Sequence, residues 1–166
     1  MKRITSVFLL FLLFSNFTLE SQVELTTINY AAFYKAFAST DIKLIDSQLS
    51  PLLKVNKDDS KAYAGALLMK KAGFVSSVID KLEFFKAGKN LLEAAMTKNP
   101  NNFEYSFLRL AIQENCPDFL GYNGQISADS KRVINNFNLL PTEVKSAILE
   151  YSKTSKALPT SSLIKK

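Results

Sequence analysis

The chain has 166 residues, 47% of them hydrophobic, so it is long enough and apolar enough to bury the core of a single domain. Its net charge of +6 is spread over lysine pairs and forms no long basic run, which argues against nucleic-acid binding. Histidine is absent and Cys116 is the only cysteine, which excludes Ser-His-Asp and Cys-His catalysis and removes the usual ligands of zinc. We therefore expect no metal, no cofactor and no intramolecular disulfide.

The beginning of the chain has the pattern of a secretory signal peptide. Lys2 and Arg3 precede an apolar run over residues 4–14, which has the length of a signal-peptide core and is too short to span a membrane. Ser15 and Ser21 are both small enough to stand before the cut, and we favour Ser21. An uncleaved anchor is the alternative interpretation.

Cleavage at this point divides the chain into three parts. They are a signal peptide over 1–21, a helical domain over 22–155 and a flexible tail over 156–166, where the sequence turns to Lys, Ser and Thr. We expect a periplasmic or secreted protein with no membrane-spanning segment after signal removal.

Helical periodicity recurs along the domain, with start and stop signals at several points. Thr26 or Thr27 can cap a first helix that ends at Ala38, and Pro51 is expected to end or kink a second helix near Ser50. A third helix over 61–72 has a face of small residues, and it can be capped by Asp58, Asp59 or Ser60. Gly73 is placed to adopt the left-handed conformation that often follows a helix.

A helical hairpin is expected at the centre of the domain. Ser77 begins a capping box for a helix that can run unbroken to Lys98, and Gly88 within it suggests a close helix crossing. The turn over 99–102 leads to a second helix over 103–113, which has few polar positions.

Two more helices complete the domain. Ser127 can cap a helix to Asn136, and Pro141 with Glu143 indicates the start of another. No segment alternates between apolar and polar residues as a strand would. The sequence thus predicts an all-α fold, a compact array of about six or seven helices around the central hairpin.

Residues 85–102 resemble the second helix and closing turn of a tetratricopeptide repeat (TPR). The matching positions are Phe85, Leu92, Ala95 and Pro100–Asn102, and the sequence departs from the family at Gly88, where alanine is preferred. Residues 62–126 are also similar in style to small exported helical proteins of environmental bacteria that have no assigned activity. The resemblance implies helix pairs with a groove for a partner polypeptide or ligand, and no catalysis.

One narrow polar stripe on the second central helix is the candidate binding site. Ser106, Arg109 and Gln113 share a face, and Arg109 could bind a carboxylate while Tyr105 supplies rigid apolar area. The alternative is that Arg109 pairs internally with Asp129 or Glu114 and ties two helices together. We therefore expect a non-catalytic binding or scaffold module with Tyr105, Arg109 and Gln113 at its site.

A carrier of an apolar small molecule or lipid is the second candidate function. The chain has thirteen phenylalanines and no tryptophan, and the loop from Phe119 to Tyr122 could form a binding lip. A phenylalanine-rich core would give the same composition. Carboxylate catalysis has only acids outside any motif to support it, so we do not expect an enzyme.

Overall fold

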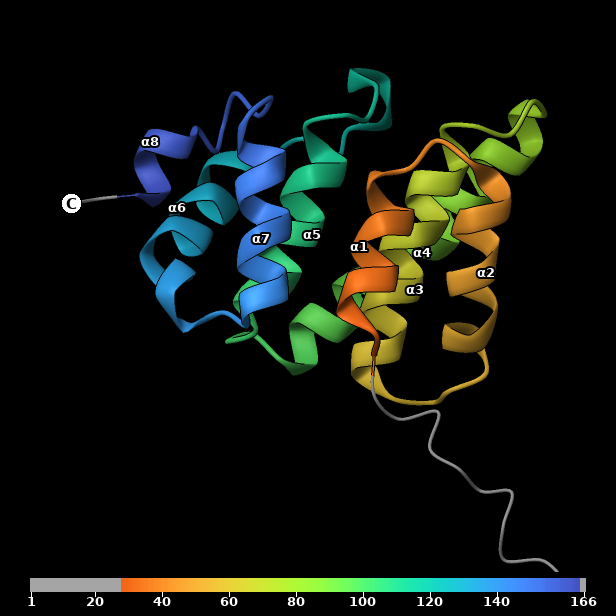
Figure 1. Cartoon of the computed structure of the whole chain (residues 1–166). Helices are drawn as coiled ribbons and strands as arrows, with labels where there is room; N and C mark the ends of the chain where they lie inside the picture. Colours follow the sequence, from red (N-terminus) through yellow and green to blue (C-terminus); the bar gives the residue numbers. More distant parts are fainter. Residues whose placement is uncertain (1–27, 165–166) are drawn as a thin grey trace, which may run out of the picture.

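The computed structural model describes residues 28–164, and the predicted signal peptide lies outside them. Within this range the fold is all-α, as predicted, with two short 3₁₀ turns and no strand (Figure 1). The helices are α1 (Tyr30–Ala38), α2 (Ile42–Leu53), α3 (Asp58–Ala72), α4 (Val78–Lys98), α5 (Phe103–Gln113), α6 (Ile126–Asn136), α7 (Thr142–Ser152) and α8 (Thr160–Leu163). The 3₁₀ turns are η1 (Asp118–Leu120) and η2 (Phe137–Leu139).

The helices form two groups that share one hydrophobic core. In Figure 1, α1 to α4 lie on one side of the molecule and α5 to α8 on the other. The most extensive contact in the described chain is between α3 and α4, and α3 also packs against α1, α2 and α5. The central element is therefore α3, whereas the sequence suggested the α4–α5 hairpin, whose two helices contact each other only at a few positions.

The crossing of α3 and α4 depends on two glycines that face each other. A Cβ atom on Gly88 would lie 2.5 Å from the carbonyl oxygen of Gly65, and one on Gly65 would lie 2.6 Å from that of Gly88. Both distances are too short for non-bonded atoms, so each glycine permits the other backbone to approach. The close crossing predicted at Gly88 is confirmed, and its partner is Gly65.

Side-chain hydrogen bonds cap several helices, and the predicted cap Ser77 is confirmed. The Asp41 side chain accepts a hydrogen bond from the Lys43 N–H at 2.8 Å, and Ser77 accepts one from the Asp80 N–H at 3.2 Å. Asn102 caps α5 by accepting from the backbone N–H of Glu104. These bonds satisfy N–H groups that have no partner within their own helices.

Other predicted ends are wrong, because a different residue supplies the cap or the helix continues. Helix α1 begins at Tyr30 with Asn29 as its cap, through a 3.0 Å bond from Ala32 N–H, and the predicted caps Thr26 and Thr27 lie outside the described residues. Helix α2 includes Pro51 and ends at Leu53. A proline this close to the end of a helix disturbs only the last turn, so it need not stop the helix earlier.

Three further start and stop signals were misread. Asp58 and Asp59 lie in the first turn of α3, where carboxylates favour the positive end of the helix dipole, and the N-cap residue Lys57 makes no side-chain cap. Helix α3 ends at Ala72 as predicted, but Gly73 has φ −68°, which is right-handed, so the expected left-handed conformation is wrong. Ser127 lies inside α6, whose N-cap is Gln125.

The predicted flexible tail over 156–166 is wrong for the part of it that the structure describes. Leu158 is fully buried, and residues 160–163 form α8, in which Leu163 is also buried. These apolar side chains fold the segment back onto the domain despite its polar neighbours. Across residues 28–164, no helix has the combination of length and apolar character needed to cross a bilayer.

Candidate functional site

The polar stripe on α5 is buried. Ser106 is 0% exposed, Gln113 is 3% exposed, and the side chain of Arg109 is 15% exposed. The hydroxyl oxygen of Ser106 and Oε1 of Gln113 have no hydrogen-bond partner among the described residues. The sequence therefore placed these side chains correctly on one face of α5, and that face is packed inside the domain.

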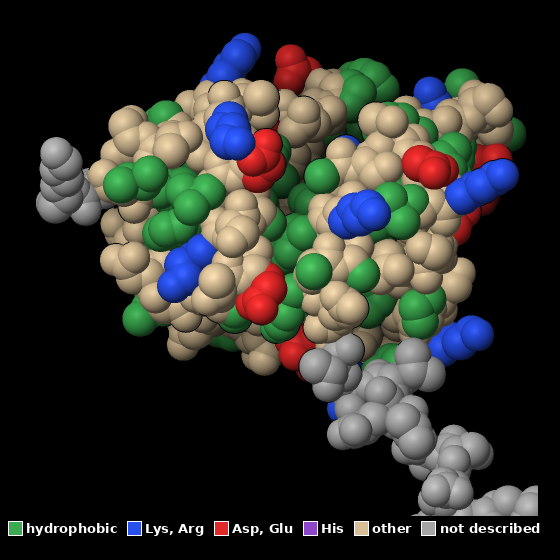
Figure 2. Space-filling view, in the orientation of Figure 1, with side chains coloured by type: hydrophobic (Ala, Val, Ile, Leu, Met, Phe, Trp, Pro, Cys, Tyr) green, Lys and Arg blue, Asp and Glu red, His purple; other side chains and the backbone are tan. Residues whose placement is uncertain are grey.

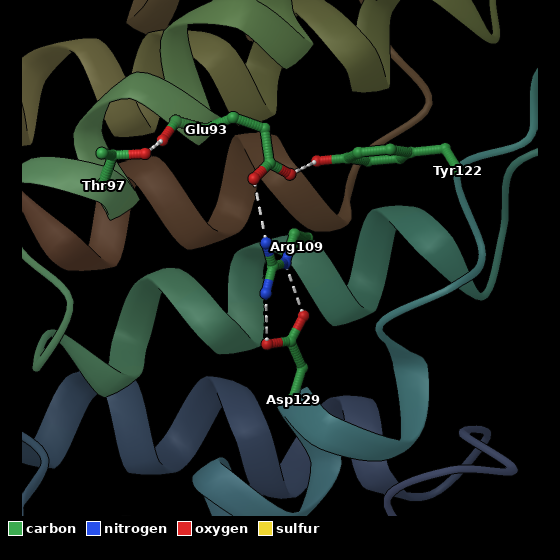
Figure 3. Close-up of polar contacts among 5 residues, drawn as sticks. All are labelled: Glu93, Thr97, Arg109, Tyr122 and Asp129. Carbon is green, nitrogen blue, oxygen red and sulfur yellow. Dashed lines mark hydrogen bonds and ion pairs between the residues drawn. The ribbon is translucent and has the colours of Figure 1, made fainter.

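Arg109 is the centre of a four-residue polar network (Figure 3). Its Nε donates to Oδ2 of Asp129 at 2.6 Å and its Nη2 donates to Oδ1 of the same carboxylate at 2.9 Å. The remaining terminal nitrogen, Nη1, donates to Oε2 of Glu93 at 2.9 Å. The other oxygen of Glu93 accepts a 2.7 Å hydrogen bond from the Tyr122 hydroxyl.

This network connects three helices and a loop. Glu93 belongs to α4, Arg109 to α5 and Asp129 to α6, while Tyr122 lies in the segment between α5 and α6 (Figure 3). Asp129 is fully buried, so its charge depends on the bidentate guanidinium. Burial, and then the bond to Glu93, raises the pKa of Tyr122, which keeps its hydroxyl protonated as the donor. Arg109 is thus the internal tie that the sequence offered as the alternative, with Asp129 as the partner.

Glu114, the other acid considered for Arg109, has a different role. It accepts hydrogen bonds from the backbone N–H groups of Lys156 and Ala157, at 3.0 and 2.9 Å, and from the hydroxyls of Tyr151 and Ser155. Burial by itself would raise the pKa of Glu114, but these four bonds outweigh it and lower the pKa. Glu114 therefore holds the segment after α7 against the end of α5.

The remaining predicted site residues divide into buried and exposed ones. Tyr105 is fully buried, its hydroxyl donates to Asp59, and its ring meets Tyr63 edge-on at 6.4 Å. Tyr122 is buried, with its ring 5.6 Å from that of Phe85. Phe119 is 86% exposed. The structure therefore separates the two aromatic residues that the sequence grouped as one lip.

The phenylalanines considered for a carrier cavity include several that pack on other aromatic rings. Phe33 stacks on Phe37 at 5.7 Å and meets Tyr63 edge-on at 4.6 Å. Phe107 contacts Tyr34 and Tyr151 at 6.0 and 5.6 Å. These rings pack against one another, as expected in a phenylalanine-rich core.

An open hollow that the sequence analysis did not identify lies at the end of the molecule where α4 turns into α5. Its volume is about 680 Å³, and its walls come from the start of α1, the α4–α5 turn and the segment before α7. In Figure 1 these segments meet at the lower end of the molecule. The residues around it are Tyr30, Lys98–Glu104 and Leu139–Pro141.

Polar and apolar side chains alternate around this hollow. Asn99 and Asn101 bring side-chain amides, Phe103 and Tyr30 bring aromatic rings, and Leu139 is 74% exposed. Such a mixture of amides and apolar side chains resembles the composition of sites that bind extended polar chains or small polar ligands.

Glu104 is the one acidic residue that lines the hollow, and it is 4% exposed. Its carboxylate accepts a hydrogen bond from the Tyr34 hydroxyl. Burial raises the pKa of Glu104, and the nearby Asp59 acts in the same direction. A positively charged group of a ligand would favour the ionised form of Glu104. Among residues 28–164, no group of three or more acids and cysteines is arranged to hold a metal ion.

The sequence contains only weak signals for the hollow. The run Asn99–Asn102 predicts only a turn, and Glu104 is an acid that lies in no motif. Leu139 and Leu140 come from a segment almost forty residues later, and no local pattern indicates that they meet the α4–α5 turn. Only the tertiary fold brings the two segments together.

Comparisons of this chain with known proteins found no match. No protein-family model matches the chain, and no curated protein and no solved structure is significantly similar to it. The resemblance of residues 85–102 to a TPR helix and turn stays a prediction that rests on those residues alone.

Proposed function

We propose that this protein is an exported, non-catalytic binding module that holds a segment of a partner polypeptide in the hollow beside the α4–α5 turn. The observation that carries the proposal is the hollow itself, whose wall combines the exposed side chains of Asn99 and Asn101 with exposed apolar side chains. This location replaces the buried stripe on α5. Export rests on the signal-peptide pattern over residues 1–21.

The chemistry of the wall suits a peptide backbone. A side-chain amide both donates and accepts hydrogen bonds, as a peptide group does, so Asn99 and Asn101 can pair with a chain laid across them. Asn102 is occupied in capping α5 and supports the wall from behind. The exposed side chain of Leu139 offers apolar contact to the side chains of the partner.

Glu104 suggests which residue the partner presents. Its buried carboxyl can accept from a lysine or arginine side chain that reaches the base of the hollow, and such a pair is strengthened by its removal from water. The Tyr34 hydroxyl donates to this carboxyl and holds it in place. We therefore expect the partner segment to carry a basic residue flanked by apolar ones.

The internal ties are consistent with a rigid wall. The Arg109 network joins α4, α5 and α6, so the α4–α5 turn is supported on both of its helices. A preformed site loses less conformational entropy on binding than a mobile one.

The proposal is tested by selecting peptides from a phage-displayed random library and measuring their affinity by fluorescence anisotropy. We expect enriched peptides to contain a basic residue, and Leu139→Ser and Asn101→Ala each to weaken binding at least about tenfold, or about 1.4 kcal/mol. Both side chains are exposed, so neither change should unfold the domain.

Matched controls are available on the same domain. Leu53→Ser and Asn90→Ala change exposed residues of the same types outside the hollow and should leave peptide affinity unchanged. Equal losses in the control and hollow variants, or no enrichment of basic peptides, would contradict the proposal.

A further inference from the structure

The first turns of α4 project beyond the rest of the domain. Residues 78–83 are exposed without interruption, and the first buried residue of the helix is Phe85. Three of these exposed side chains are apolar: Val78 is 78% exposed, Ile79 71% and Leu82 43%. At about 100° per residue they lie within one third of the helix circumference, so they form a single apolar face.

Two other segments expose an aromatic side chain at the same end of the molecule. Phe74, in the turn between α3 and α4, is 38% exposed, and Phe119 in η1 is 86% exposed. In Figure 1 the α3–α4 turn and the loop after α5 both lie at the upper end. The loop is held near α4 by the ring contact between Tyr122 and Phe85. We call these five residues, Phe74, Val78, Ile79, Leu82 and Phe119, the apolar tip.

The apolar tip contains most of the large apolar side chains that the described chain exposes. The other three are Leu53, Leu139 and Ile164, which lie apart from it in the sequence. Figure 2 shows hydrophobic side chains at the upper edge of the molecule, with both basic and acidic side chains nearby. Burial of such side chains would remove a considerable apolar surface from water.

Lysines surround the apolar tip. The ammonium of Lys70 lies 5.3 Å from the centre of the Phe74 ring, and that of Lys89 lies 5.1 Å from the centre of the Tyr122 ring. Lys86 and Lys89 continue the direction of Val78 and Leu82 one and two turns further along α4, about 6 to 11 Å behind the tip.

The acids of this region are fewer than the lysines. Asp80 lies on the side of α4 away from Val78 and Leu82, whereas Glu83 follows Ile79 by one turn and Asp118 precedes Phe119 in η1. Lys71 is paired with Asp46 at 2.7 Å and is not counted. The remaining charges around the apolar tip are four lysines (Lys70, Lys81, Lys86, Lys89) against these three acids, so the region keeps a small positive charge.

We propose that the apolar tip attaches the protein to the surface of an anionic lipid bilayer. Val78, Ile79, Leu82 and the two phenylalanines would enter the boundary between headgroups and acyl chains. Long lysine side chains behind them would reach the negatively charged headgroups. This helix end has apolar residues at its tip and cations behind them. A bilayer has the matching order, with apolar acyl chains inside and charged headgroups outside.

The test uses the full chain with vesicles of phosphatidylcholine, alone or mixed with phosphatidylglycerol. A spin label is attached to the single cysteine of the variant Ile79→Cys, Cys116→Ser. The depth of the label in the bilayer is measured from its collisions with oxygen and with a polar relaxing agent. We expect the label to enter the lipid of anionic vesicles and to remain in water with neutral ones. Every variant retains the apolar run over residues 4–14, which could itself bind vesicles. The depth of the label is therefore measured, because it does not depend on overall binding.

Matched variants sharpen this experiment. A label at Leu53 or at Leu139, both exposed and outside the tip, should stay in water throughout. In the same depth measurement, Val78→Ser with Leu82→Ser should return the label at position 79 to water with anionic vesicles. Lys86→Gln should make the label need a larger fraction of phosphatidylglycerol to enter the lipid, as expected for the loss of one cation near the surface.

Two outcomes would overturn the proposal. One is a label at position 79 that stays in water with anionic vesicles, which would leave the apolar tip to a protein partner. The other is equal depth at positions 53 and 79, which would show that the whole domain is drawn to lipid without using the tip.

Discussion

Helices α3 and α4 are joined by a different kind of contact from that between helices α5 and α6. The first brings two backbones together at Gly65 and Gly88, where no side chain fits. The second joins two side chains, Arg109 and Asp129, through a pair of hydrogen bonds. The glycine contact is sensitive to added volume and indifferent to charge, whereas the arginine contact responds to the loss of charge. The two interfaces of this domain should therefore respond to different kinds of substitution.

Removal of the arginine should have the largest effect. Arg109→Ala leaves the fully buried carboxylate of Asp129 without its partner, so we expect the free energy of unfolding to fall by about 3–5 kcal/mol. Denaturant melts followed by circular dichroism would measure it. Lys98→Ala removes the exposed ion pair with Asp58 and should cost less than about 1 kcal/mol. A loss that small at Arg109 would show that α5 and α6 do not depend on this network.

Added volume at the glycine crossing should have the next largest effect. Gly88→Ala places a methyl group against the Gly65 carbonyl, and we expect it to destabilise the domain by about 1–3 kcal/mol. In an ordinary helix the same change would be stabilising by up to about 1 kcal/mol.

Gly124 provides the control for this experiment, because a Cβ there would meet no atom within 4 Å. Gly124→Ala should therefore change stability little. If Gly88→Ala were as harmless in the same denaturant melts, α3 and α4 would not be in backbone contact.

Substitution of Glu114 should give a smaller effect that depends on pH. The pKa of this carboxyl is lowered in the folded protein from its ordinary value of 4.5, so ionised Glu114 stabilises the fold. Its contribution is present above pH 4.5 and is lost as the pH falls through the lower folded pKa. Thermal melts of the wild type and Glu114→Gln should therefore differ most near neutral pH and converge in acid. A difference that grows in acid would contradict the hydrogen bonds assigned to Glu114.

Glu104 should show the opposite pH dependence with the smallest effect, because an amide in its place preserves the shape of the side chain. Burial raises the pKa of this carboxyl, so the folded state disfavours its ionisation. As the pH rises above 4.5 and through the folded pKa, the wild type should lose stability relative to Glu104→Gln. The same series of thermal melts measures it. Parallel pH profiles for the two glutamine variants would show that the two carboxyls do not differ in environment.

Local rules accounted for much of the fold. The start of α4 followed from the capping box at Ser77, and the end of α4 and start of α5 followed from the turn over 99–102, because both signals depend on residues close together in the sequence. Where several oxygens were available, as at Thr26, Thr27 and Asn29, the sequence did not reveal which one would cap. The central position of α3 depends on packing between distant segments, which periodicity does not express.

The candidate site was less accessible to sequence reasoning. The pair Arg109–Asp129 was recognised as a possibility because the two charges complement each other, yet Glu93 and Tyr122 join it only through the fold. Burial of Tyr105 and Gln113 could not be distinguished from exposure, since a helix with few polar positions gives no sign of which face meets solvent. Leu158 shows the same limit, because a single leucine among polar residues does not show that it will be buried.

The hydrogen bonds of Glu114 also limit when the carboxyl-terminal helices can finish folding during synthesis. Glu114 has emerged from the ribosome well before Ser155, Lys156 and Ala157, which provide three of its four hydrogen bonds. Until they arrive, the end of α5 lacks its cover, and Leu158 cannot occupy its place in the core. The α3–α4 pair needs no such late residues. The amino-terminal helices can therefore assemble on the nascent chain, while the carboxyl-terminal group has to wait for the last residues of the described chain to be made.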